Sequence, residues 1–299
     1  MALLIVYRAG GDAFYSDVAE RLYSGTRDVV KDVRLVTTDA LPRVPADILR
    51  GTTVALVNPR ACAGSPGVLA ATGASMRKIA VLAEPAESEG YGAALALPLT
   101  FDALIDLGFV PQAAGHSRSD VPYHFVFNGA TARETIALAE QSVEPRRIPW
   151  AVIGDYTLDE AVLTSELIRT VDPGGLVLLP PTRTGREDGG LVRVGVLREL
   201  LSSARYYVWC SRGPRRYYEH MRFVGALTAG AVPCRVELTA RGEGVDVPWA
   251  FPSVDALCAS LVEAERASMY RAARDYFLSK SSLARNLRTA YESIAPELV

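Results

Sequence analysis

Residues 217–234 read Tyr217-Tyr-Glu-His-Met-Arg-Phe-Val-Gly-Ala-Leu-Thr-Ala-Gly-Ala-Val-Pro-Cys234. Apolar residues recur every three or four positions in the first part, which predicts a helix over about 216–229. Gly230 then ends the helix, because glycine adopts the left-handed backbone conformation that follows many helices at no steric cost. The apolar residues after it predict a strand over 232–237. The stretch is therefore a helix–turn–strand unit, the repeating element of an α/β fold.

The same alternation extends through the whole chain. The apolar runs are short and continuous, which is typical of parallel strands covered on both faces. Further strands are expected over 3–7, 33–37, 53–58, 78–83, 123–128, 150–154, 176–179 and 206–210, and further helices over 12–23, 130–141, 158–170, 193–203, 253–266 and 268–295.

One segment interrupts the alternation. Glu144-Pro-Arg-Arg-Ile-Pro-Trp150 carries two prolines and two arginines ahead of a fresh apolar run, a pattern that favours a domain boundary. We therefore expect an α/β protein of two Rossmann-like domains facing a central cleft, with the first over 1–147 and the second over 148–299.

Composition excludes several classes of protein. The chain has 299 residues, of which 49% are hydrophobic, and 32 basic residues balance 34 acidic ones. The high hydrophobic content predicts a folded protein, and the near-neutral charge disfavours a nucleic-acid partner. No apolar run approaches the roughly 18 residues of a membrane span, and the first residues lack the basic region of a signal peptide. The expected location is cytoplasmic.

Metal and cofactor sites have little support. The four cysteines form no C-x-x-C pair and the three histidines no ligand spacing, so no metal is expected. Arg8-Ala-Gly-Gly-Asp12 stands after the first strand in place of G-x-G-x-x-G, and no P-loop motif or G-x-S-x-G elbow occurs, so no nucleotide cofactor is expected. Only three of the basic residues are lysine. An anion site would therefore depend on arginine side chains or backbone N–H groups.

The opening stretch also carries a resemblance. Arg222-Phe-Val-Gly-Ala-Leu-Thr-Ala-Gly-Ala-Val-Pro233 resembles the R-x-x-E-A-L-A-x-G-x-x-P block in the second domain of GT-B glycosyltransferases, closest to the family 4-like and spore-maturation-like branches. Residues 206–211 and 251–262 resemble the segments that flank this block, and the resemblance covers about 148–295. It implies a nucleotide-sugar donor held by the second domain, an acceptor held against the first, and a terminal helix that crosses back to the first domain.

Matching the block position by position assigns donor-binding residues. Arg222 falls near the donor diphosphate, Phe223 follows it in the block, and Gly230 allows the backbone to approach the diphosphate. The family's ribose-binding glutamate falls on Gly225, so the usual ribose contact is in doubt. Glu219 is the nearest acidic side chain on the same helix, and we expect it to contact the donor sugar as a catalytic residue.

Other donor-binding candidates follow from their places at strand ends. Gly154 follows the first strand of the second domain, and Arg183 and Arg186 lie in the loop after the next strand. Such loops line the cleft of open α/β sheets. Two arginines could hold a diphosphate by paired hydrogen bonds, although the same loop could equally be a solvated surface.

Candidates for acceptor activation lie in the first domain. Asp12 follows the first strand and could cap the next helix or act as a base. His116 and His124 could remove a proton from the acceptor, because imidazole titrates near neutral pH. Either histidine could instead be an ordinary loop or core residue.

The function expected is transfer of a sugar from a nucleotide-sugar donor to a small-molecule or glycan acceptor, without a metal and, as the resemblance implies, with retention. Two alternatives stay open. One is a non-catalytic GT-B-like protein that binds a nucleotide or a sugar. The other is a phosphate-handling enzyme such as a sugar epimerase.

Overall fold

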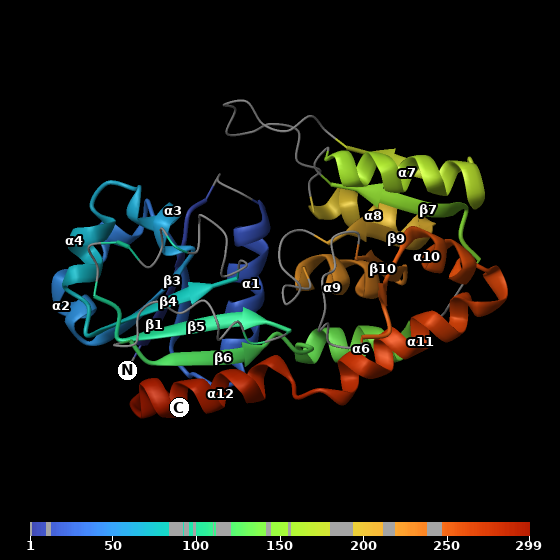
Figure 1. Ribbon diagram of the computed structural model, residues 1–299. Coiled ribbons are helices and arrows are strands. Elements are labelled where there is room, and N and C mark those ends of the chain that lie inside the picture. The colour runs from blue at the N-terminus through green and yellow to red at the C-terminus, as the bar shows by residue number, and fades with distance from the viewer. Residues whose placement is uncertain are drawn as a thin grey trace. The chain divides into compact units, whose positions relative to one another are not determined.

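The computed structural model describes residues 2–9, 13–83, 92, 96–97, 100–109, 111, 121–141, 145–154, 157–179, 194–211, 219–237 and 247–299. In these residues the chain forms two parallel sheets with helices between the strands (Figure 1). The α/β fold class expected from the sequence is confirmed. The chain divides into two compact units, one of Met1–Ala132 with Ser281–Val299 and one of Arg133–Lys280.

The sheet of the first unit has six strands. They are β1 (Ala2–Tyr7), β2 (Val33–Thr37), β3 (Thr52–Val57), β4 (Arg77–Leu82), β5 (Ala103–Gly108) and β6 (Tyr123–Phe127), in the order β2-β1-β3-β4-β5-β6. The helices are α1 (Ala13–Arg27), η1 (Leu41–Arg43), α2 (Ala46–Arg50), α3 (Pro59–Ala63), α4 (Val68–Gly73), α12 (Leu283–Ile294) and η3 (Pro296–Leu298).

Helices cover both faces of this first sheet. Leu4 and Val54 point to one face and share a buried cluster with Leu49 of α2 and with residues of η1 and α4. Strand side chains alternate between faces, so Leu3 and Ile5, both without exposed surface, point to the other one. That face is covered by α1, which packs on β1 and β2.

The last helix packs on the first unit. α12 contacts α1 and β6, the backbone N–H of Leu283 donates to the carbonyl of Ala130 at 3.1 Å, and the Asn286 amide donates to the Phe127 carbonyl at 2.9 Å. The segment expected as one helix over 268–295 forms parts of two helices, α11 (Glu263–Ser279) and α12. They are separate because α11 ends at Ser279 and the Ser282 side chain caps the start of α12.

The sheet of the second unit has five strands. They are β7 (Ile148–Ile153), β8 (Leu176–Leu178), β9 (Ala204–Cys210), β10 (Val232–Val236) and β11 (Ala250–Phe251), in the order β11-β10-β9-β7-β8. The helices are α6 (Ala132–Glu140), α7 (Leu158–Thr170), α8 (Val194–Ser203), α9 (His220–Ala229), α10 (Val254–Ser260) and α11 (Glu263–Ser279).

The division between the units falls at Ala132/Arg133 and not at the expected 147/148. The stretch around Arg146 belongs to the second unit because this side chain is buried there. Its guanidinium donates to the carbonyls of Leu201 and Ala229, at 3.0 and 2.9 Å. The proline- and arginine-containing stretch is therefore an integral part of the second unit and not a linker.

The helix–turn–strand unit of the opening stretch is confirmed in its main features. α9 begins at His220, after the expected start, and ends at Gly230, whose φ is +77°. β10 follows at once and pairs in parallel with β9, with Val232 opposite Tyr206.

Candidate functional site

The strand order of the second sheet indicates where a ligand binds. β8 lies on one side of β7 and β9 on the other, so the connections that leave β7 and β9 run in opposite directions. In open parallel sheets the crevice at this switch point, at the carboxyl ends of the strands, is the usual ligand site. The residues there come from the end of β7, the start of α7 and the start of α9, and we call them the switch-point site.

Arg222 and Gly154 meet in the switch-point site. The Arg222 guanidinium lies so close to Gly154 that a Cβ at Gly154 would stand 2.8 Å from its Nη2 atom. Its Nη1 atom is 3.5 Å from the carbonyl oxygen of Ile153, and about one fifth of the side chain is exposed. Glycine at position 154 therefore makes room for a cation that solvent can still reach.

A buried carboxylate holds this guanidinium. Oε1 of Glu160 lies 3.7 Å from Nη1 of Arg222, and the Glu160 side chain is 1% exposed. The Thr157 hydroxyl donates to Oε2 of Glu160 at 2.8 Å, and the backbone N–H of Glu160 donates to the hydroxyl oxygen of Thr157 at 3.1 Å. Threonine and glutamate three residues apart thus cap α7, and the same glutamate orients Arg222.

Glu219 lies at the start of α9, the helix that carries Arg222, and belongs to a second charged cluster. Its Oε2 atom is 3.0 Å from Nε of Arg235 and accepts a hydrogen bond from the Trp209 indole at 3.3 Å. Arg235 has no exposed surface, and its Nη1 atom also lies 2.6 Å from Glu237. The contacts give Glu219 a structural role in a buried ion pair, and its role on the donor sugar stays a prediction.

Two predicted donor-binding residues are placed elsewhere. Phe223 has no exposed surface, because its ring packs against Trp249 and Phe277 with centroids 4.1 and 5.5 Å away. It is a core residue of the second unit and offers nothing to a ligand. A Cβ at Gly230 would stand 2.2 Å from Arg146, so this glycine makes room for a structural arginine and not for a diphosphate.

Gly225, where the family places its ribose-binding glutamate, faces open space. A Cβ built there would meet nothing within 4 Å. The surroundings of Gly225 therefore leave room for a longer side chain, and no steric contact requires glycine at this position.

Four predicted site residues lie outside the described residues. They are the acceptor-side candidates Asp12 and His116 and the loop arginines Arg183 and Arg186. Their roles stay predictions. In the described part of the chain no group of three or more His, Cys, Asp or Glu residues is arranged to hold a metal ion.

His124 is described, on β6, and is partly buried. Burial lowers the pKa of this imidazole below its ordinary value of 6.5. In the unfolded chain the ring therefore takes up a proton more readily than in the folded protein. Stability should fall as the pH drops through 6.5 and level off below the folded-state pKa.

We expect His124→Gln to flatten this dependence. Thermal melts between pH 7.5 and 5 would show a smaller loss of melting temperature on acidification in the variant than in the unchanged protein. Equal slopes in the two proteins would show that His124 does not titrate differently on folding.

Sequence reasoning missed Glu160, which orients Arg222, and Arg235, which pairs with Glu219 in the second charged cluster. Glu160 could have been found, because Thr157-Leu-Asp-Glu160 is the threonine-x-x-glutamate pattern of a helix start. Arg235 carries a weaker signal, a single charge inside an apolar strand. A buried charge needs a partner, but the sequence alone does not say which carboxylate supplies it.

Comparison with known proteins shows similarity of fold. No protein-family model matches the chain, and no curated protein matches its sequence. Among solved structures, a β-glucosyltransferase described as a DNA-modifying enzyme, crystallised with and without uridine diphosphoglucose, is 10% identical, with a TM-score of 0.55 over 98% of this chain and 99% of that one. An α1,3-fucosyltransferase is 11% identical, with a TM-score of 0.47 over 98% of this chain and 90% of that one. At such identity the first likeness concerns the fold alone, and it agrees with the GT-B-like fold expected from the sequence.

None of the described helices is both long enough and apolar enough to cross a bilayer.

Proposed function

We propose that this protein is a glycosyltransferase that binds a nucleotide-sugar donor at the switch-point site of its second unit. The observation that carries the proposal is the Arg222 guanidinium, held against Gly154 at the carboxyl ends of β7 and β9. A partly exposed cation at this place suits a diphosphate. The full-length likeness of the fold to a glucosyltransferase supports the same function.

The chemistry of the transfer follows from the charges. The sugar leaves behind a nucleoside diphosphate, whose developing negative charge must be stabilised. Arg222 supplies a positive charge, the buried Glu160 carboxylate lies 3.7 Å from its guanidinium, and about one fifth of the Arg222 side chain stays exposed. Transfer is proposed to need no metal and to proceed with retention, with Arg183 and Arg186 as further contacts to the diphosphate and a small molecule or glycan as acceptor.

A thermal-shift panel of UDP, GDP, dTDP and ADP tests donor binding. A ligand at about 100 times its Kd stabilises the folded state by about 2.7 kcal/mol, which is a visible shift. The proposal expects one of the four to raise the melting temperature, equally with and without EDTA. No shift with any of them at millimolar concentration would overturn it.

Arg222→Ala should weaken binding of the nucleotide that gives the shift. Loss of a charged hydrogen bond costs about 1.5–3 kcal/mol, roughly a ten- to hundredfold rise in Kd. Gly154→Ala should have a smaller effect in the same direction, because the new Cβ would displace the guanidinium. Titration calorimetry measures both.

The matched control is Arg169→Ala in the same unit. Arg169 pairs with Glu166 on the exposed side of α7, so its loss should leave nucleotide affinity unchanged. An unchanged Kd in Arg222→Ala, or an equal loss in Arg169→Ala, would remove Arg222 from the site.

A second candidate function is binding of the nucleotide or sugar without transfer. It is favoured by the ion pair between Glu219 and Arg235, which occupies the acidic side chain expected to act on the donor sugar. Release of free sugar from the bound donor would support the enzyme. Stable binding of the intact donor, with no sugar released or transferred, would support the binding protein.

A further inference from the structure

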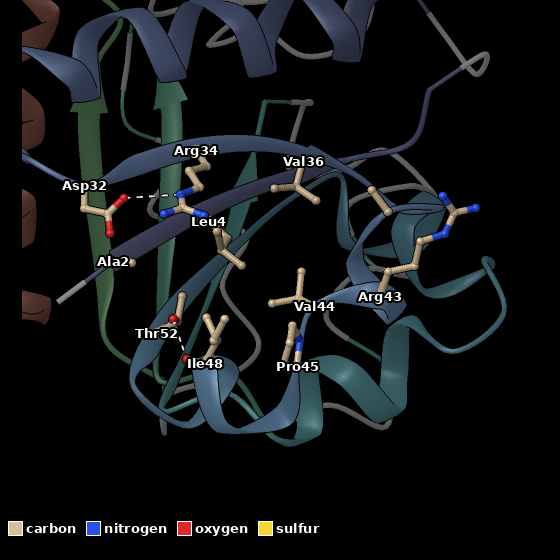
Figure 2. Close-up of a pocket in the computed structure, with 11 residues that line it drawn as sticks. Ala2, Leu4, Asp32, Arg34, Val36, Arg43, Val44, Pro45, Ile48 and Thr52 are labelled. Atoms are coloured by element: carbon tan, nitrogen blue, oxygen red, sulfur yellow. Dashed lines mark hydrogen bonds and ion pairs between the residues drawn. The ribbon is translucent and has the colours of Figure 1, made fainter.

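A pocket of about 430 Å³ opens in the first unit, away from the carboxyl ends of its strands. The apolar side chains that line it are Leu4 of β1, Val36 of β2, Val44 at the end of η1 and Ile48 of α2 (Figure 2). Ile48 is 48% exposed, so solvent reaches the apolar wall. The size falls within the range of small-molecule sites, which are mostly apolar with a few polar groups.

The pocket results from incomplete cover over the edge of the sheet. Among the described strands β2 lies at the edge of the sheet and pairs only with β1. On this face the pocket is bordered by η1 and α2, which have only three and five residues. Val36 and Val44 are consequently only partly buried against the core of this face.

The polar rim of the pocket has a net positive charge. Arg34 and Arg43 contribute two cations and Asp32 one anion. Asp32 meets Arg34 through Nε alone, at 3.3 Å, and Figure 2 shows the Arg34 guanidinium beside Leu4 while Arg43 points away from the apolar wall. Arginine has five N–H donors, and the Arg34 side chain is 68% exposed, so its terminal nitrogens are accessible to a ligand at the rim of the pocket.

We propose that this pocket binds a small carboxylic acid with a compact apolar tail. The carboxylate pairs with the terminal nitrogens of Arg34, which Asp32 orients through Nε. The tail covers Val36, Val44 and Ile48 and removes their exposed apolar surface from water, which drives binding. This site is independent of the proposed donor site, because none of its residues belongs to the second unit.

Methyl NMR with three probes of equal tail length tests the proposal. Octanoate, 1-octanol and octylamine share an apolar chain and differ in charge. Octanoate is expected to shift the methyl signals of Val36, Val44 and Ile48 at the lowest concentration, 1-octanol at a higher one and octylamine at the highest. Equal affinities for octanoate and octylamine, or shifts confined to other methyl groups, would overturn the proposal.

Two arginine variants separate the carboxylate contact from general attraction to charge. Arg34→Ala should weaken octanoate binding about 1.4- to fivefold, the range for an exposed ion pair, and leave 1-octanol unchanged. Arg50→Ala removes an exposed arginine of α2 that does not line the pocket, and it should leave both probes unchanged. The same loss in the two variants would show that Arg34 makes no specific contact. The nucleotide panel, read on the same proteins, reports separately on the second unit.

Discussion

Replacing Arg235 with methionine is expected to lower the free energy of unfolding by about 3–5 kcal/mol, the usual cost of removing one partner from a buried ion pair. Arg235 has no exposed surface and lies between the carboxylates of Glu219 and Glu237. Methionine fills a similar space with a flexible apolar chain, so most of the loss would come from the two carboxylates left without their cation. Urea unfolding of the two proteins measures the difference.

The double variant Arg235→Met, Glu219→Gln is the informative control. Neutralising Glu219 removes one of the stranded charges, so the double variant should be more stable than Arg235→Met alone. Arg34→Met removes a cation from an exposed pair and should change stability by less than about 0.5 kcal/mol. Equal stability of Arg235→Met and the unchanged protein would show that the buried pair contributes nothing.

Glu219→Gln alone also tests the catalytic prediction for Glu219. A purely structural role predicts a loss of stability with sugar transfer intact in the protein that remains folded. A role on the donor sugar predicts loss of transfer with little change in nucleotide affinity. The two readouts are independent, so each role can be rejected separately.

Most of the fold could be predicted because most apolar runs decide their own structure, although β5 (Ala103–Gly108) and the short helices α2 and α4 were not expected. The strand β7, and the helix that ends before Gly230 and is followed by β10, depend on local pattern alone. The unit boundary could not be predicted in the same way. Prolines and arginines at 144–150 resemble a linker, and only the tertiary contacts of Arg146 with carbonyls 55 and 83 residues away in sequence make the stretch part of the second unit.

The proximity of Gly154 and Arg222 could be expected from the sequence, because both follow strands of the second domain. Gly154 and Arg222 follow neighbouring strands of one sheet, and the structure brings them together. Phe223 was assigned to the donor site because it follows Arg222 in the motif. Adjacent residues of a helix point to different sides, however, so a motif that places one of them at a ligand does not place the next. Arg222 and Phe223 are consecutive on α9, so one reaches the switch point while the other fills the core.

Gly129→Ala is expected to lower the free energy of unfolding by about 3 kcal/mol, the upper end of the cost of overpacking. A Cβ at Gly129 would stand 2.1 Å from the backbone oxygen of Ser281, and no side-chain rotation relieves a clash with backbone. The start of α12 would have to move, and its hydrogen bond from Leu283 to the Ala130 carbonyl would break. Urea unfolding and hydrogen exchange of the α12 amides measure the effect.

Hydrogen exchange would show whether α12 is the part that moves. α12 packs on α1 and β6, so its displacement should speed exchange of the α12 amides while the amides of the second unit stay protected. Gly225→Ala is the control, because a Cβ there meets nothing within 4 Å in the interior of a helix. Alanine at that position should stabilise the protein by about 0.5–1 kcal/mol. If Gly129→Ala unfolded at the same urea concentration as the unchanged protein, with α12 still protected, the close approach of the Ser281 carbonyl to Gly129 would be refuted.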